Sequence, residues 1–392
     1  MQKKIVIVGG GIGGLSTALA CGYRDLPVQL IERNKVFAEV GAGIQISPNI
    51  VRLLEGWGLK DGLDALACFP SQLEIRSALN ADLLGLLPLG ERAVKRYGAR
   101  YATIARADLH GLLLKAVNAQ GSTQLIVGNA VEFVSQDASA VTVTTADGQN
   151  RRANVLIGAD GLWSQVRDFV RLDAQPAFTG YVAYRAMVAQ TDLPETLRSD
   201  VITAWMGPDF HAVQYPVHHG ELLNVVIIVK ASAPADLGLW NQTADVHALQ
   251  TYLAQAAAPL QELVSSISKW NLWPLCGLPK VRSAQELAFG RIALLGDAAH
   301  PMLPFLAQGA GMAIEDAFAM ADVLQQSTHD DADALERFAR RRWKRNARVQ
   351  AGAVRNGEIF HATGLKRWGR DTAMKLFGAR MIDVPWLYRG RY

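Results

Sequence analysis

A glycine-rich loop near the N-terminus constrains the fold of this chain more than any other feature. The loop spans residues 9–14 and lies between the β-branched run of residues 5–8 and an Ala- and Leu-rich stretch. Its Gly9, Gly11 and Gly14 form a GxGxxG pattern. Such glycines allow, in turn, a tight turn, the approach of a diphosphate to the backbone, and close packing of a helix on a sheet. The pattern therefore predicts a strand, a loop and a helix that together bind a dinucleotide.

A second strand with a terminal carboxylate strengthens this prediction. Residues 28–31 form a short apolar run, and Glu32 follows it, 18 residues after Gly14. A carboxylate at this strand end can accept hydrogen bonds from ribose hydroxyls, and the amides that open the preceding helix attract phosphate groups. The N-terminal segment is therefore predicted to be a dinucleotide-binding β-α-β unit.

Buried strands of the same kind recur later in the chain. Residues 155–157 and 291–295 are apolar runs that end close to a glycine and an aspartate. Such runs are typical of parallel strands that are covered on both faces. We predict one parallel sheet with strands near residues 5, 28, 155 and 291. Residues 125–134 alternate in polarity and predict one further strand.

The stretch from about residue 180 to 280 differs from the rest, with strand-like runs at 212–217 and 222–229. It predicts a second, sheet-rich module, which makes the first domain discontinuous in sequence. Residues 309–326 and 333–354 predict long helices. We predict a cofactor-binding domain of residues 1–75, 98–178 and 282–330, a substrate-binding domain of residues 76–97 and 179–281, and a C-terminal helical segment of residues 331–392.

Composition excludes several other classes of protein. The net charge is only +4, and the one dense basic run, residues 340–345, is interpreted as a solvated helix face. The three cysteines form no CxxC pair and lie near no His cluster, so we expect no metal site and a reducing cytoplasmic environment. No apolar run reaches the roughly 18–20 residues that cross a bilayer. We expect a cytoplasmic protein that binds no nucleic acid and has no integral membrane segment.

Two later motifs distinguish FAD from NAD as the dinucleotide. Asp160-Gly161 follows one of the later strands, and Gly296-Asp297 follows the other. Asp297 at a strand end can bind a ribityl hydroxyl, although the same position also suits the N-cap of a helix. The amides that open the next helix, near Gly309 to Met312, can stabilise negative charge on a reduced flavin.

The order and spacing of these three motifs resemble the single-component flavoprotein aromatic hydroxylases over nearly the whole chain. The subgroup that is most similar contains 3-hydroxybenzoate 6-hydroxylase, salicylate hydroxylase and 6-hydroxynicotinate 3-monooxygenase. The resemblance implies an α/β fold, with a Rossmann-like FAD-binding domain of the glutathione-reductase type, an inserted sheet-rich substrate domain and C-terminal helices.

Finer features extend the resemblance to the cofactor. Arg33 follows Glu32 as the adenine-side residue, residues 41–49 are similar to the second flavin loop, and Arg106 matches a cofactor-contacting arginine. The residues expected to contact FAD are Gly9, Gly11, Gly14, Glu32, Arg33, Gln45, Arg106, Asp160, Asp297, Gly309 and Gly311.

The candidate substrate site lies in the strand-like run 210–217. His211 and Tyr215 point to one face of a strand, where they could bind a carboxylate and handle a phenolic proton. The resemblance implies that both are catalytic and that Gln45 and Pro304 also contact the substrate. The alternative is that His211 and Tyr215 are ordinary core residues.

The resemblance implies a reaction in which NADH or NADPH, with NADH favoured, reduces FAD, and O2 then gives a flavin C4a-hydroperoxide that hydroxylates a small acidic aromatic ring. Leu303 and the pair Phe305-Leu306 replace polar residues of relatives, so the ring position that is attacked stays open. We expect a monomer or a homodimer.

Two other functions are compatible with these motifs. A flavin-dependent reductase or dehydrogenase would use the same fold without inserting oxygen, and a flavin-binding regulatory protein would oxidise no NADH with any aromatic acid. A plain NAD-dependent dehydrogenase explains neither Asp160-Gly161 nor Gly296-Asp297.

Overall fold

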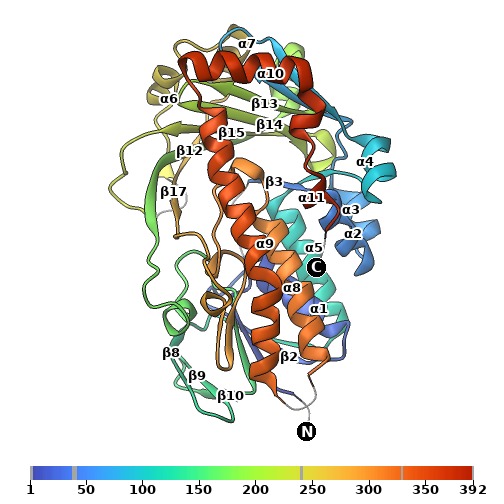
Figure 1. The fold of residues 1–392 in the computed structure, drawn as a ribbon, viewed down its shortest axis with the longest axis vertical. Coiled ribbons are helices and arrows are strands. Elements are labelled where there is room, and N and C mark those ends of the chain that lie inside the picture. The colour runs from blue at the N-terminus through green and yellow to red at the C-terminus, as the bar shows by residue number, and fades with distance from the viewer. Residues whose placement is uncertain (1–2, 38–41, 239–241, 328–329, 391–392) are drawn as a thin grey trace.

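The computed structural model describes residues 3–37, 42–238, 242–327 and 330–390. Two large sheets lie at opposite ends of an elongated molecule, and helices fill the space between them (Figure 1). The sheet near the N-terminus has the order β18-β19-β11-β1-β2-β7. Its strands are β1 (Ile5–Val8), β2 (Val28–Glu32), β7 (Thr123–Val127), β11 (Val155–Gly158), β18 (Ala288–Phe289) and β19 (Ile292–Leu294).

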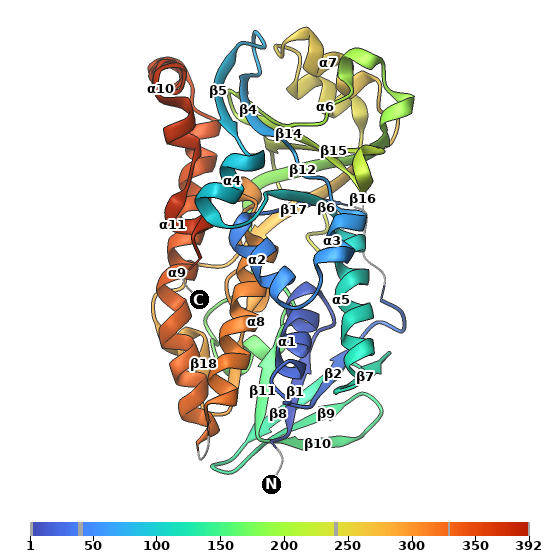
Figure 2. The same ribbon diagram turned by 90° about the vertical axis from the view of Figure 1, so that its right-hand side faces the viewer.

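The four strands expected to share a sheet do so. β1 pairs in parallel with β2 and with β11, and β11 pairs in parallel with β19. All four are buried over nearly their whole length, which explains their continuous apolar sequence. Helix α1 (Ile12–Gly22) follows β1 and packs against α5 (Arg106–Gln120) and α8 (Gly309–Gln325) (Figure 2).

The prediction of a single strand over residues 125–134 is wrong. β7 ends at Val127, and Gly128 has a φ of +70°, a left-handed conformation that glycine tolerates and that breaks an extended run. The chain then starts β8 (Val131–Gln136), which pairs with β9 (Val141–Thr145). β10 (Asn150–Ala153) completes this separate sheet of three strands.

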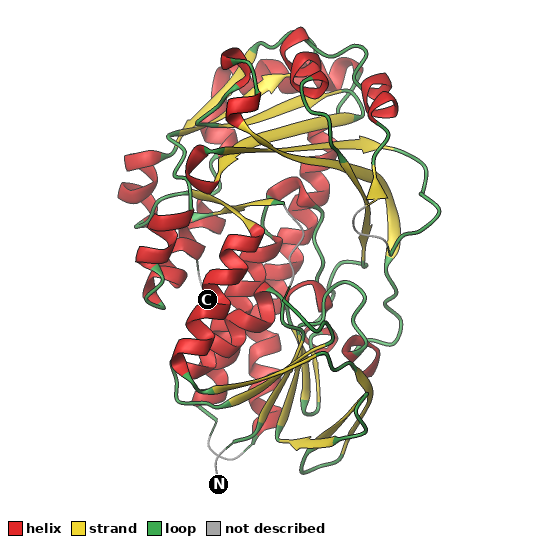
Figure 3. Cartoon of the chain, turned by 180° about the vertical axis from the view of Figure 1, so that it is seen from behind, coloured by secondary structure: helices red, strands yellow, loops and turns green. Residues whose placement is uncertain are grey.

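The second large sheet has the order β16-β17-β12-β15-β14-β13-β4-β5, so two separate segments of the chain build it. Figure 3 shows it at the end of the molecule away from the N-terminus. Its strands are β4 (Gln72–Ser77), β5 (Leu83–Pro88), β12 (Ala177–Ala189), β13 (Ile202–Gly207), β14 (Phe210–Val217), β15 (Leu222–Lys230), β16 (Gln242–Thr243) and β17 (Asn271–Gly277). The domain boundaries given above stay a prediction.

The two faces of this sheet have different partners. Phe210 and Ala212 of β14 belong to the same apolar cluster as Leu249 of α6 (Val246–Tyr252) and Leu260 of α7 (Ala258–Ser265), so they mark the outer face. The alternate residues of β14 point the other way. That opposite side, here called the inner face, meets β3 (Gly43–Ile46), which pairs with β6 (Ala102–Ala105).

The remaining helices surround this junction. α9 packs against α8, and α10 packs along β5 at the edge of the second sheet. These helices are α2 (Pro48–Gly56), α3 (Lys60–Leu66), α4 (Gly90–Tyr97), α9 (Asp331–Phe360), α10 (Gly364–Ile382) and α11 (Pro385–Tyr388). Within the described ranges, none of the helices is both long and apolar enough to cross a membrane.

The interpretation of residues 340–345 as a solvated helix face is wrong at its centre. Arg342 is fully buried in α9, where it donates to Glu315 Oε2 at 2.9 Å and to Asp316 Oδ1 at 2.7 Å. Arg345 also pairs with Glu315, whereas Arg340 stays exposed. The helix needs buried cations here because α8 presents two carboxylates to it.

The same carboxylates hold the loop after β19. Asp316 Oδ2 accepts a hydrogen bond from Gly296 N at 3.2 Å and lies 2.5 Å from His300 Nε2. Burial alone would raise the pKa of Asp316, but the charges and hydrogen bonds of His300 and Arg342 outweigh it and hold that pKa below its ordinary value. The ionised carboxylate therefore ties α8, α9 and the loop of residues 296–300 together.

We expect Arg342→Met to lower the free energy of unfolding by about 3–5 kcal/mol, because it removes the buried cation that two carboxylates share and leaves Glu315 with Arg345 and Asp316 with His300. The matched change Arg340→Met removes only an exposed pair with Glu336 and should cost less than about 1 kcal/mol. Urea unfolding of both variants measures the difference. Equal losses would contradict a stabilising role for the buried cation.

Candidate functional site

Of the three glycines in the GxGxxG pattern, one faces open space and two are required by packing. A Cβ atom on Gly9 would lie 2.4 Å from Ala159 O, and one on Gly14 would lie 1.8 Å from Gly9 O. Gly9 also has a φ of +103°. A Cβ on Gly11 would meet nothing within 4 Å. Gly9 and Gly14 are thus needed by the fold, while Gly11 leaves the backbone accessible to a ligand.

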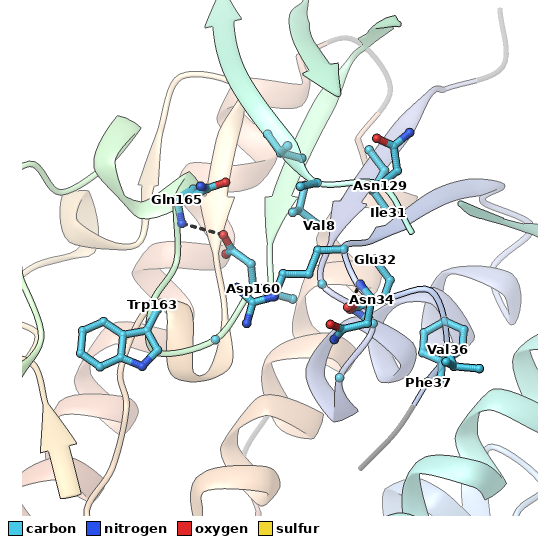
Figure 4. A pocket seen from close by; sticks show the side chains of 18 of the residues that line it. Val8, Ile31, Glu32, Asn34, Val36, Phe37, Asn129, Asp160, Trp163 and Gln165 are labelled. Atoms are coloured by element: carbon cyan, nitrogen blue, oxygen red, sulfur yellow. Dashed lines mark hydrogen bonds between the residues drawn. The ribbon is translucent and has the colours of Figure 1, made fainter. Parts of the chain in front are cut away.

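A pocket of about 370 Å³ opens beside this loop, at the carboxyl ends of β1, β2 and β11 (Figure 4). This end of a parallel sheet is where nucleotide ligands bind. The lining residues include Gly9, Gly10, Gly11, Glu32, Arg33, Asn34, Phe37, His110, Asn129, Asp160, Gly161, Trp163 and Gln165.

Helix α1 opens onto the pocket with its amides uncapped. Its N-cap is Gly11, so no side chain caps it, and its first turn contains no acidic residue. The free amides and the positive end of the helix dipole can therefore act on a phosphate.

Glu32 organises the wall of the pocket. Its Oε2 accepts a hydrogen bond from Gly10 N at 2.7 Å, and its Oε1 accepts one from Asn34 N at 2.8 Å. Each carboxylate oxygen can accept a second bond, so ribose hydroxyls can still bind. His110 lies on the other side of the loop, with its Nε2 2.7 Å from Gly10 O. His110 was not predicted from the sequence, because its partner Gly10 lies 100 residues away along the chain.

Asp160 lines the pocket but directs its carboxylate at its own loop. Oδ2 accepts from Gln165 N at 2.8 Å (Figure 4) and from Val166 N at 3.2 Å, and Oδ1 accepts from the Ser164 hydroxyl at 2.6 Å. Burial raises the pKa of Asp160 although these hydrogen bonds oppose the shift. The geometry gives Asp160 a structural task, and its predicted contact with the cofactor stays a prediction.

The two later motifs are physically joined through Arg167. This buried side chain donates to Leu162 O at 2.8 Å, to Ala174 O at 3.2 Å and to Ala298 O at 3.2 Å. Ala298 directly follows Asp297. The loop after β11 therefore fixes the loop after β19, which explains why both motifs belong to one site.

Asp297 is the free carboxylate of this second loop. It lies within the short 3-10 helix of residues 296–298 and caps neither that helix nor α8, whose N-cap is Gln308, so the N-cap alternative is wrong. Its side chain is exposed, and it makes no hydrogen bond to any residue that the structure describes. Although solvent reaches this side chain, the protein atoms around it desolvate the carboxylate and raise its pKa, and the charges of Arg106 and His300 oppose that shift.

Gly309, Gly311 and Gln45 are also predicted to contact the cofactor, and Gly309 lies beside Asp297. A Cβ atom on Gly309 would lie 4.0 Å from Asp297 Oδ1, and one on Gly311 would press on Ile50 of α2. No side chain caps α8, so the amides at Gly309 can act on a negative group. Gln45 of β3 accepts a hydrogen bond from the Tyr101 hydroxyl at 2.8 Å.

His211 is buried on the inner face, among aromatic rings. Its Nδ1 lies 2.7 Å from Nε2 of His361, at the end of α9, and its ring contacts Phe305 and Phe360. Burial, followed by the charge of His361, lowers the pKa of His211 well below its ordinary value. Burial also lowers the pKa of His361 to about 4. Both rings are therefore neutral near pH 7.

Tyr215 lies four residues along the same strand, roughly 13 Å from His211 at the extended rise per residue. A Cβ on Gly43 would lie 2.6 Å from Tyr215 Cε2, so Tyr215 packs against the predicted flavin loop. Burial raises the pKa of Tyr215 above its ordinary value. The structure thus places both residues on one face, at opposite ends, and their catalytic roles stay predictions.

The inner face also carries polar residues that were not predicted from the sequence. They are Arg185 of β12 and Asn224 of β15, and Trp273 of β17 lies under the guanidinium of Arg185 at 3.8 Å. Pro304 lies beside Phe305 in a short 3-10 helix at residues 304–306. An arginine in an otherwise apolar alternation, Ala183-Arg185-Met187, was the available signal.

Comparisons with known proteins agree with this geometry. The family model described as "FAD binding domain" matches residues 2–353. The 3-hydroxybenzoate 6-hydroxylase of Polaromonas naphthalenivorans is 33% identical, over 98% of this chain and 95% of that protein. The 6-hydroxynicotinate 3-monooxygenase of Bordetella bronchiseptica is 33% identical, over 89% of this chain and 90% of that protein.

Solved structures show the same likeness. A salicylate hydroxylase substrate complex superposes with a TM-score of 0.84 at 27% identity, covering 99% of this chain and 96% of that one. Klebsiella pneumoniae HpxO, complexed with FAD and uric acid, gives a TM-score of 0.84 at 28% identity, with 97% and 96% covered. The chain therefore belongs to the FAD binding domain family, and within it to the FAD-dependent aromatic hydroxylases, which are enzymes.

Proposed function

We propose that this enzyme hydroxylates a small acidic aromatic compound, of the hydroxybenzoate, salicylate or hydroxypyridine-carboxylate type, with O2 and with NADH or NADPH. The observation that carries the proposal is a buried, uncharged histidine, His211, on the inner face that meets the flavin loop. The similarity to a 3-hydroxybenzoate 6-hydroxylase and to a 6-hydroxynicotinate 3-monooxygenase supports the substrate class.

The residues present fit FAD. The open backbone at Gly11, the uncapped start of α1 and the carboxylate of Glu32 suit a diphosphate and a ribose. Asp297 and the uncapped start of α8 suit the ribityl chain and a negatively charged ring. When bound, FAD supplies the redox chemistry that takes electrons from a nicotinamide and activates oxygen.

The chain itself would manage the phenolic proton of the substrate. A deprotonated phenol makes the ring more electron-rich, so a nearby base favours hydroxylation. If the proton shared with His361 sits on Nδ1 of His211, then Nε2 of His211 is an acceptor. We propose that His211 takes the proton in this tautomer, and that Phe305 and Phe360 keep water away from it.

Gly11→Val should abolish FAD binding while leaving the fold intact, because the new side chain enters open space that the diphosphate needs. Gly111→Val is the matched control, since a Cβ there also meets nothing within 4 Å but lies on the surface of α5. Absorbance at the flavin band and circular dichroism report cofactor content and fold. A yellow Gly11→Val protein with full occupancy would place the diphosphate elsewhere.

His211→Ala should slow hydroxylation by about 10²–10⁴-fold, because a general base is lost. It should also raise the hydrogen peroxide formed per NADH consumed, since oxygen activation continues beside a badly placed ring. The exposed His247 of α6 provides the control variant His247→Ala. Product and peroxide are measured together at saturating substrate. A normal rate with normal coupling would leave His211 as a core residue.

The neutral histidine pair should also make stability depend on pH. His361 takes up a proton near pH 6.5 when unfolded and near pH 4 when folded, so the unfolded state binds more protons between these values. The free energy of unfolding therefore falls as the pH drops through this window, by about 2 kcal/mol between pH 7 and pH 5 for this residue.

His361→Phe should remove that part of the dependence, while His247→Gln should retain it. Urea unfolding at pH 7 and pH 5 provides the comparison. An unchanged pH dependence in His361→Phe would show that His361 is not held neutral by burial.

A further inference from the structure

Arg185 lies on the same face of the sheet as His211 and Tyr215. The pairing of β12 with β15 sets Arg185 opposite Val226, and the pairing of β15 with β14 sets Val226 opposite Val213. Directly opposed residues share a face, and Val213 alternates with His211 and Tyr215 along β14. The register therefore brings a guanidinium to the inner face.

This guanidinium has no anionic partner among the described residues. The Nε atom of Arg185 is buried and donates to nothing, and the group stacks on the Trp273 ring at 3.8 Å. Burial lowers its pKa to about 10, which still leaves it charged at neutral pH. A largely buried cation without a counter-charge is costly, so such a group calls for a functional explanation.

The other buried arginines show the contrast. Arg342 meets two carboxylates, Arg171 pairs with Glu286, and Arg167 is satisfied by three backbone carbonyls. Each of these three guanidinium groups therefore has at least one carboxylate or carbonyl partner, although Nε and Nη1 of Arg171 make no hydrogen bond within the described part of the chain. Arg185, in contrast, has neither a carboxylate nor a carbonyl partner among the described residues.

A second unused donor lies beside it. Asn224 is 1% exposed, and its Oδ1 accepts a hydrogen bond from Gly43 N at 2.6 Å. That bond fixes the orientation of the amide, because only the oxygen can accept. The Nδ2 atom is left buried without an acceptor. Asn224 is two residues from Val226 on β15, so it is a diagonal neighbour of Arg185.

Tyr215 completes the group. It lies directly opposite Asn224 in the register, and Arg185 is near enough for its charge to oppose the raised pKa of Tyr215. Because burial raises the pKa of Tyr215, its hydroxyl keeps its proton and can donate. By register Arg185 is level with Val213, between His211 and Tyr215, so the three donors lie on the Tyr215 half of the inner face, next to the flavin loop at Gly43.

We propose that Arg185, together with Asn224 Nδ2 and the Tyr215 hydroxyl, binds the carboxylate of the aromatic substrate. This inference rests on the proposed function, and it assigns the two ends of the site. The carboxylate meets the cationic end, and the phenolic hydroxyl points towards His211. Donors that are buried and unpaired without the substrate select strongly against a neutral analogue, because that analogue leaves them unsatisfied.

The test compares acids with their carboxamides. Salicylate, 3-hydroxybenzoate and 6-hydroxynicotinate, each beside its amide, are titrated into the FAD-loaded protein while the flavin absorbance is followed. The wild type should bind at least one acid more tightly than its amide. Arg185→Gln should weaken that acid roughly 10- to 100-fold, as expected for hydrogen bonds to a charged group, and change the amide less than about 3-fold.

Two further readouts separate binding from a structural role. The melting temperature of Arg185→Gln without ligand should be unchanged or raised, because an unpaired buried cation is removed. Asn224→Asp should also weaken acid binding, since it supplies Arg185 with a built-in carboxylate while keeping the bond to Gly43 N. Arg340 is exposed, so Arg340→Gln is the control, and it should change neither the melting temperature nor the affinity for the acid.

The outcomes distinguish the two proposals. If the wild type hydroxylates an acid but Arg185→Gln leaves the ratio of acid affinity to amide affinity unchanged, the carboxylate site is refuted and the proposed function stands. A loss of FAD affinity with an unchanged ratio would assign Arg185 to the cofactor and also refute it. A wild type that prefers no acid overturns the carboxylate site, and one that converts no acid overturns the proposed function.

Discussion

The buried ion pairs between Arg342 and the two carboxylates of α8 are the interaction on which the arrangement of the site depends. Glu315 also accepts from Asn49 of α2, and Asp316 also holds Gly296 and His300. One cation on α9 thereby fixes α8, whose N-terminus faces Asp297, and the loop that carries Asp297. Arg167 then joins this loop to the one after β11. Buried charges with complete partners cost much to separate, so these connections give the cofactor site a rigid frame.

The second sheet contributes the opposite wall of the site, and its inner face carries both satisfied and unsatisfied polar groups. His211 is neutral and hydrogen-bonded to a residue from the far end of α9, whereas Arg185 and Asn224 keep donors unused. A structural core satisfies its polar groups, while a binding surface leaves some for the ligand. The unused donors of Arg185 and Asn224 lie on the inner face, where they would recognise a substrate.

Much of the first sheet could be predicted from the sequence, because strands covered on both faces are continuously apolar and GxGxxG fixes the local geometry. Arg342 could not be recognised as buried, because its partners come from another helix and a basic run has the same letters in solution and in the core. Likewise His110 and His361 lie far in sequence from the groups that they touch. Only tertiary structure brings such pairs together.

The central claim is that oxygen from O2 is inserted into an aromatic acid bound at the inner face. The most direct measurement is the turnover of that acid by the wild-type protein under oxygen-18 gas, with NADH consumption and product mass followed together. The account predicts one labelled oxygen atom in the product for each NADH consumed when coupling is complete. NADH oxidation that yields only hydrogen peroxide with every acid, or a product labelled from water, would contradict it.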